Sequence, residues 1–151
     1  MALKPDRIEA YTDISFFMNQ VAERGGVAVH VTAGEGVSMD DANAVVEYPS
    51  DPSGTAPAGL LLNDVVNYDL TRQHINWHRD EVQIGSKVTL LRQGQVVTNL
   101  VASGVAPTAG DDAYYAADGE LTTVSTNSVK VGRFLSSLDA DGYVKVDINI
   151  T

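Results

Sequence analysis

Turn-forming residues divide this chain into short segments, and this division limits the possible folds more than any other feature. Glycine, proline, asparagine and aspartate recur throughout, and the segments between them are rich in valine, threonine, isoleucine and tyrosine. β-Branched and aromatic residues favour strands, whereas the interrupting residues favour turns. No strong helical periodicity competes with this pattern. The sequence therefore predicts many short strands joined by hairpins and loops.

The clearest strand is predicted at the end of the chain, over residues 143–150. Successive side chains of a strand point to opposite faces, and here apolar and polar positions alternate strictly. One face carries Val144, Val146, Ile148 and Ile150, and the other carries Tyr143, Lys145, Asp147 and Asn149. We therefore expect a half-buried strand, entered through a turn at Asp141-Gly142.

Two further hairpins are predicted upstream of this strand. Residues 87–92 and 95–101 are typical of strands, with Gln93-Gly94 as the expected turn between them. Residues 114–115 and 121–124 flank Asp118-Gly119, a dipeptide that tight hairpin turns prefer. Another strand is expected over residues 129–135.

The N-terminal half gives less regular predictions. Residues 8–18 match a strand more fully than a helix, through Ile8, Ala10, Thr12, Ile14, Phe16 and Met18. A short helical turn is expected over residues 19–24. Further strands are expected at 27–31, 45–48 and 60–62, and the last of these is expected to be followed by a strand edge at residues 65–66. Loops or irregular segments are expected at 32–44, 49–58 and 70–81.

About eight to ten short strands with hairpin turns indicate a mostly β fold, a small antiparallel β-barrel or sandwich with long loops. At 151 residues, the whole chain (residues 1–151) suits a single domain.

Composition and charge argue against several classes of function. The net charge of -10 disfavours nucleic-acid binding, because phosphate contacts need clustered lysine and arginine. No apolar run approaches the roughly 20 residues of a membrane helix. The first residues lack the apolar stretch of a signal peptide, so we expect neither export nor membrane anchoring. The absence of cysteine removes disulfides, thiolate nucleophiles and cysteine-based zinc sites.

Motifs that suggest metal binding have simpler interpretations. His74 and His78 are spaced like two ligands on a helix, but the segment HINWH lacks the glutamate of a metalloprotease motif. Asp139 and Asp141 resemble a fragment of a calcium loop. A strand follows them directly, so a hairpin turn is the better interpretation.

Motifs for catalysis are equally weak. The adjacent acids Asp40-Asp41 and Asp111-Asp112 would point to opposite faces of a strand, which makes a poor acid–base pair. A G-x-S-x-G elbow is missing, and Gly34-Glu-Gly36 lacks the third glycine of a phosphate loop. We therefore expect no enzyme activity, no catalytic or metal-binding residues and no cofactor.

The distribution of charge marks one segment as a candidate interface. Residues 25–71 contain seven acidic residues and no lysine or arginine, whereas residues 72–92 carry a net charge of +2. Two interpretations remain open, namely a docking face for an acidic partner and a solvated face with ordinary scatter in charge. Trp77, the only tryptophan, suits either an interface anchor or a cap on the core.

The C-terminal half resembles the capsid decoration, or cement, proteins of tailed bacteriophages. The resemblance is carried by four features in order: residues 110–115 (GDDAYY), the Asp118-Gly119 turn into Leu121-Thr122, residues 131–135 (VGRFL) and residues 141–146 (DGYVKV). It covers residues 80–151 well and residues 14–27 only loosely. The segments 49–58 and 70–81 have no counterpart in it.

This resemblance implies a small β-barrel, expected as a homotrimer, that binds the outside of the mature viral head and braces neighbouring major capsid protein subunits. The protein would be made in the host cytoplasm and located on the outer surface of the virion. Residues 1–12 are expected to form an extended N-terminal arm that reaches a neighbour. The expected capsid or subunit interface comprises Arg7, Arg72, His74, Trp77, His78, Arg79, Lys87 and Arg92.

Two other functions remain under consideration. One is a virion-associated carbohydrate- or host-surface-binding β module, based on the tyrosines, the tryptophan and the β class. The other is a trimeric β enzyme such as a nucleotide hydrolase, against which the missing phosphate-binding motifs already argue.

Overall fold

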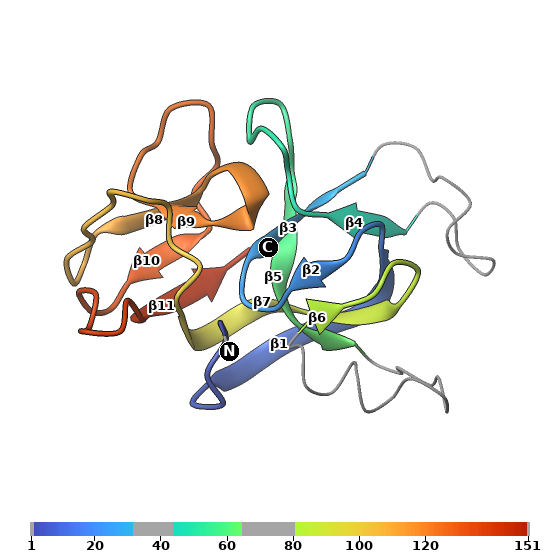
Figure 1. The fold of residues 1–151 in the computed structure, drawn as a ribbon, viewed down its shortest axis with the longest axis horizontal. Helices are drawn as coiled ribbons and strands as arrows, with labels where there is room; N and C mark the ends of the chain where they lie inside the picture. Colours follow the sequence, from blue (N-terminus) through green and yellow to red (C-terminus); the bar gives the residue numbers. More distant parts are fainter. Residues whose placement is uncertain (1, 32–43, 65–80, 151) are drawn as a thin grey trace.

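The structure is a computed structural model that describes residues 2–31, 44–64 and 81–150. In these ranges the chain forms strands and one short 3-10 turn, η1 (Figure 1). The elements are β1 (Ile8–Met18), β2 (Ala22–Glu23), β3 (Val27–His30), β4 (Val45–Glu47), β5 (Pro57–Asp64), β6 (Glu81–Val82), β7 (Lys87–Thr98), β8 (Asp112–Tyr115), η1 (Ala117–Gly119), β9 (Leu121–Thr122), β10 (Gly132–Phe134) and β11 (Val144–Asn149). The described part of the chain has no helix long and apolar enough to cross a membrane.

Nine strands form one large sheet in the order β1-β4-β3-β5-β7-β11-β10-β8-β9, while β2 and β6 pair separately. β1 also pairs with β7, so the pairings of β1, β4, β3, β5 and β7 form a closed circuit. The strand pairs are antiparallel except for β1 with β4, which is parallel. The expected mostly β fold is confirmed, with this one parallel pair as the exception to a wholly antiparallel arrangement.

The centre of the sheet is buried on both faces. β3 and β5 send alternate side chains into two apolar clusters, so that Leu60 and Leu62 lie in the larger cluster and Leu61 in the smaller one. A strand that is buried on both faces needs apolar residues at every position, which explains the uninterrupted apolar run at 60–62. The larger cluster is completed by side chains from β8, β10 and β11, among them Tyr115, Phe134 and Ile148.

Two sequence predictions in the C-terminal half are confirmed. In β11 the side chains of Val144, Val146 and Ile148 are buried, while the intervening side chains are exposed or half-buried. β8 and β9 form the predicted hairpin, and Asp118 and Gly119 both have the left-handed backbone that such turns require, with φ of 60° and 73°.

The predicted hairpin at Gln93-Gly94 is wrong, because β7 is one continuous strand of 12 residues that runs through both positions. One edge of β7 pairs with β1, and the other pairs first with β5 and then with β11. A Cβ on residue 94 would lie 2.1 Å from the carbonyl oxygen of Ile8. Glycine is therefore required here by the close approach of β1, not by a turn.

Smaller differences concern the lengths and types of elements. The helical turn expected over 19–24 is wrong, since Ala22–Glu23 forms β2 and pairs with β6. The strand expected over 129–135 is shortened to β10, and β5 begins at Pro57, inside the expected loop. The predictions for residues 32–43, 65–66 and 70–80 lie outside the described residues.

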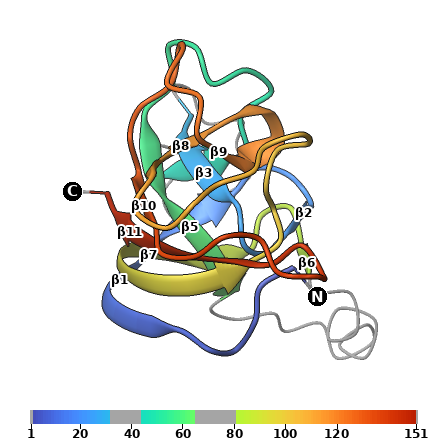
Figure 2. The same cartoon turned by 90° about the vertical axis from the view of Figure 1, so that its left-hand side faces the viewer.

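The start of the chain packs against its own domain. Leu3 forms a bridge with Thr98, and the Lys4 amide donates to the Val97 carbonyl at 2.9 Å. Ala2 and Leu3 are buried, and residues 8–12 belong to β1, which lies beside β7 (Figure 2). The reach of an N-terminal arm to a neighbouring molecule stays a prediction.

Candidate functional site

β1 exposes large apolar side chains to an unusual degree. Ile8, Tyr11 and Ile14 are 58%, 51% and 51% exposed, and they are three of the eight exposed large hydrophobic residues in the described ranges. Scattered single residues of this kind are normal on a protein surface, but a group of them on one strand is typical of an interaction surface.

The backbone of β1 also has an edge that is partly unpaired among the described residues. Its first edge pairs with β7 along most of its length, but its second edge pairs only at Phe17 and Met18, with β4. Over residues 8–16 that second edge has no strand partner among the residues that the structure describes. A free edge of this kind is the feature to which a partner chain adds a strand.

Irregular pairing explains why the predicted alternation in residues 8–18 does not give one buried face. The register between β1 and β7 shifts between Glu9 and Tyr11, between Tyr11 and Thr12, and between Asp13 and Phe16. Bulges redirect side chains and bend a strand. Most of β1 is consequently exposed, and only its last residue, Met18, is fully buried.

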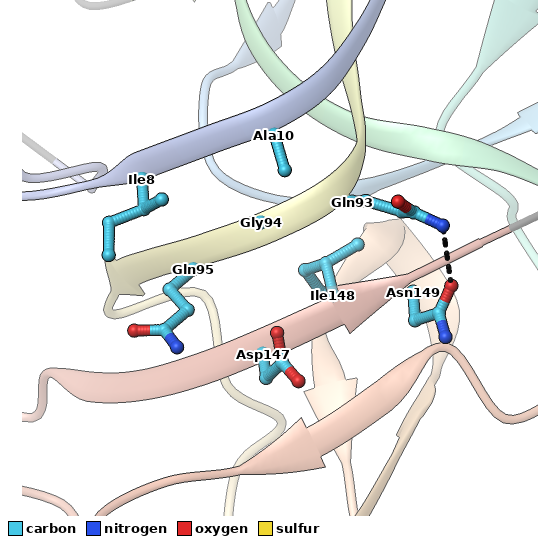
Figure 3. A pocket seen from close by; sticks show the side chains of 8 residues that line it. All are labelled: Ile8, Ala10, Gln93, Gly94, Gln95, Asp147, Ile148 and Asn149. Atoms are coloured by element: carbon cyan, nitrogen blue, oxygen red, sulfur yellow. Dashed lines mark hydrogen bonds between the residues drawn. The ribbon is translucent and has the colours of Figure 1, made fainter.

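Beside β1, a hollow of about 350 Å³ lies in the face formed by β1, β7 and β11, and Gly94 is one of its lining residues (Figure 3). This Gly94 hollow is lined by Ile8, Ala10, Gln93, Gly94, Gln95, Asp147, Ile148 and Asn149. The strand register places Gln95 beside Asp147 and Gln93 beside Asn149. Gln93 Nε2 donates a hydrogen bond to Asn149 Oδ1 at 3.4 Å.

Two polar side chains in the hollow have no partner within the described part of the chain. Gln95 and Asp147 are half-buried, and neither side chain makes a hydrogen bond or an ion pair there. Arg133 lies across from Asp147 in the β10–β11 pair, and Lys145 lies two residues before it on the same strand, yet neither reaches the carboxylate. Half-buried polar groups without a protein partner bind water or a ligand.

Three of the predicted interface residues fall in the described ranges, and all three flank the β1–β7 pair. Arg7 Nε lies 2.7 Å from Glu9 Oε1, and Lys87 Nζ lies 5.9 Å from the centre of the Phe17 ring. The other five, Arg72, His74, Trp77, His78 and Arg79, lie outside the described residues. The structure thus brings Arg7, Lys87 and Arg92 to one strand pair.

Arg92 binds its own domain in a way that the sequence did not indicate. Its Nε donates to the Ile150 carbonyl at 3.2 Å, and its Nη1 lies 3.9 Å from Asp13 Oδ2. The guanidinium also lies 5.8 Å from the centre of the Tyr11 ring. Arg92 therefore joins β1 to the end of β11, and it also contacts Tyr11 of the exposed apolar group.

The acidic motifs have structural partners. Asp139 Oδ1 accepts hydrogen bonds from the amides of Asp141 and Tyr143, at 2.9 and 2.8 Å, as expected for a turn. Asp111 accepts from the amide and the hydroxyl of Thr108, and these bonds lower the pKa of its carboxyl group. In the ranges described, no group of three or more histidines and acids is arranged to hold a metal ion. His74, His78, Asp40, Asp41 and Gly34–Gly36 lie outside those ranges.

Comparison with protein families places these features in a known group. The family model described as "Structural cement protein (E217 gp24/Pam3 gp6)" matches residues 6–149. The match extends from just before β1 to the end of β11, so it includes the exposed strand and the Gly94 hollow. No curated protein matches the chain.

Proposed function

The chain belongs to the family of phage structural cement proteins, and from this premise we propose that it binds the major capsid protein through the surface of β1. As a cement protein it is a component of the virion that decorates the capsid and stabilises it. Membership of this family implies that the protein binds capsid subunits. Our proposal concerns which capsid protein it binds and which of its own surfaces it uses.

The observation that supports β1 is its combination of exposed Ile8, Tyr11 and Ile14 with an edge that is unpaired among the described residues over 8–16. Burying the exposed half of three such side chains contributes roughly 2–5 kcal/mol before the costs of association. A shell repeats each contact many times by symmetry, so a modest contribution per site is sufficient. Arg7 and Lys87 flank the strand and would add electrostatic steering towards acidic patches.

The architecture suits a brace between subunits. Five strands form a closed circuit of pairings, and the central strands are buried on both faces, so a load applied to β1 is carried into the core. We propose that the protein acts by binding alone, without a catalytic step, and that it does so as a homotrimer. Sedimentation equilibrium of the purified protein tests the trimer, and a single monomeric species at micromolar concentration would contradict it.

The test of the capsid interaction is co-sedimentation with expanded heads, with unexpanded precursor heads as the control. We expect saturable binding to expanded heads and greater resistance of those heads to heat. Tyr11→Ser combined with Ile14→Ser should weaken binding at least tenfold. Loss of the contact between the Tyr11 ring and Arg92 should lower the melting temperature of the free protein by no more than about 4 °C.

Val124→Ser is the matched control for these variants, because Val124 is 54% exposed but lies after β9, away from β1. It should bind like the unmodified protein. Equal binding by the β1 variant and this control would contradict the β1 surface. No binding by the unmodified protein to heads of its own virus would contradict the proposed partner.

A further inference from the structure

We propose that the Gly94 hollow is a second contact site, which holds an extended segment of a capsid subunit with one side chain inserted over Gly94. This inference rests on the proposed function, because it takes a capsid subunit as the partner. It adds a site on the face of the sheet, distinct from the apolar strand β1 that borders it (Figure 3).

The spacing of the polar side chains fits an extended peptide. Gln93 and Asn149 form one row across β7 and β11, and Gln95 and Asp147 form the next row on the same face. Rows two residues apart on a strand are separated by about 6.6–6.8 Å, which is also the repeat of an extended chain. A peptide lying along the strands therefore presents equivalent backbone groups to each row in turn.

The chemistry of the rows also matches peptide groups. Carboxamides both donate and accept hydrogen bonds, and the Asp147 carboxylate accepts them. Gln95 and Asp147 have no hydrogen-bonding partner among the described residues, so a ligand that binds to this row breaks no hydrogen bond within the described part of the chain. Lys145 and Arg133 lie near Asp147 and offset its charge, which favours an uncharged polar ligand over an isolated ion.

The apolar lining of the hollow explains why we expect a side chain of the partner peptide to insert there. Ile8, Ala10 and Ile148 provide apolar lining, and the backbone of Gly94 lies among them. Among the described residues, the lining contains no aromatic ring on which a sugar could stack. An apolar side chain of a peptide therefore fits this site better than a glycan does.

Site-specific crosslinking tests the inference directly. The chain has no cysteine, so Gln95→Cys introduces a single thiol to which a short photocrosslinker is attached. Bound to expanded heads and irradiated, this variant should crosslink to one contiguous segment of the major capsid protein. Val124→Cys is the negative control, and Ile14→Cys reports contact through β1.

The pattern of crosslinks separates the two proposals. Crosslinks from residue 14 but not from residue 95 would overturn the Gly94 site while supporting the β1 surface. An absence of crosslinks from both, with no co-sedimentation, would overturn the proposed function itself. Crosslinks from residue 95 to carbohydrate rather than to the capsid protein would show that the hollow binds a glycan and not a peptide. That result would overturn the inference.

Binding measurements provide the second test. Gln95→Ala combined with Asp147→Ala should weaken binding to expanded heads roughly 5- to 150-fold, the effect of losing two hydrogen bonds. The melting temperature should not change, because neither side chain has an internal partner in the described structure. Asn99→Ala combined with Asp141→Ala removes one exposed amide and one exposed acid elsewhere and should bind normally. Equal binding by the two double variants would overturn the inference.

Discussion

Gly94→Ala is expected to lower the free energy of unfolding by about 3 kcal/mol, at the upper end of the usual cost of overpacking. The new Cβ would lie 2.1 Å from the Ile8 carbonyl oxygen, whereas contacts of real Cβ atoms essentially never fall below 3.0 Å. β1 and β7 must therefore separate by about 0.9 Å at this point, the difference between those two distances. The obstacle is backbone, so no side-chain rotation relieves it. For a chain of this size the melting temperature should fall by roughly 6–12 °C.

Thermal unfolding followed by far-ultraviolet circular dichroism measures this effect. Gly104→Ala is the matched control, because Gly104 has φ of +80° but no atom within 4 Å of its added Cβ. It should cost only the backbone strain, about 1 kcal/mol. Hydrogen exchange should show lost protection in β1 and β7 for Gly94→Ala alone. Equal melting temperatures for the two variants would refute the close approach of β1 to β7. They would instead support the hairpin turn that the sequence predicts at Gln93-Gly94.

Three further experiments test buried contacts and one surface ion pair. Tyr48→Phe removes a buried hydroxyl that donates to the Glu23 carbonyl and accepts from the Gly26 amide, so denaturant titration should show a loss of about 1–3 kcal/mol. Burial raises the pKa of Tyr48 above its value of about 10 in the unfolded chain, so the unfolded protein loses this proton at a lower pH than the folded protein does. The stability of the unmodified protein should therefore fall as the pH rises above about 10, and Tyr48→Phe should lack this part of the pH dependence. Phe134→Ala opens a cavity in the larger cluster and should cost about 3–5 kcal/mol in the same titration. The ion pair of Lys130 with Asp112 is half exposed, and a double-mutant cycle should assign it less than about 1 kcal/mol.

Local patterns in the sequence predicted those elements whose structure depends on local interactions. The alternation in β11 and the Asp118-Gly119 turn were correct because side-chain period and left-handed backbone are properties of a few neighbouring residues. The same reasoning failed at Gly94. A glycine that permits close approach and a glycine that makes a turn are identical in sequence, and the strand that approaches Gly94 is distant from it in the sequence.

The candidate site was predicted only in part for the same reason. The sequence selected basic residues, and three of them do flank the β1–β7 pair, although Arg92 is bound to Ile150 within the domain. The Gly94 hollow was not predicted, because it depends on the register of β7 with β11. The signal was present in the alternation of Gln93 and Gln95 around Gly94, but only the pairing shows that Asn149 and Asp147 lie beside them.

The closed circuit of strands has a consequence for the synthesis of the protein. β1 is synthesised before β7, yet β7 is its main partner and begins only at Lys87. At about 5–20 residues per second, β1 waits roughly 4–16 seconds for that partner to be made. During this time its apolar side chains and the edge that later pairs with β7 are open to other nascent chains. Premature termination before β7 should therefore yield fragments that aggregate, so the yield of decorated heads depends on uninterrupted translation.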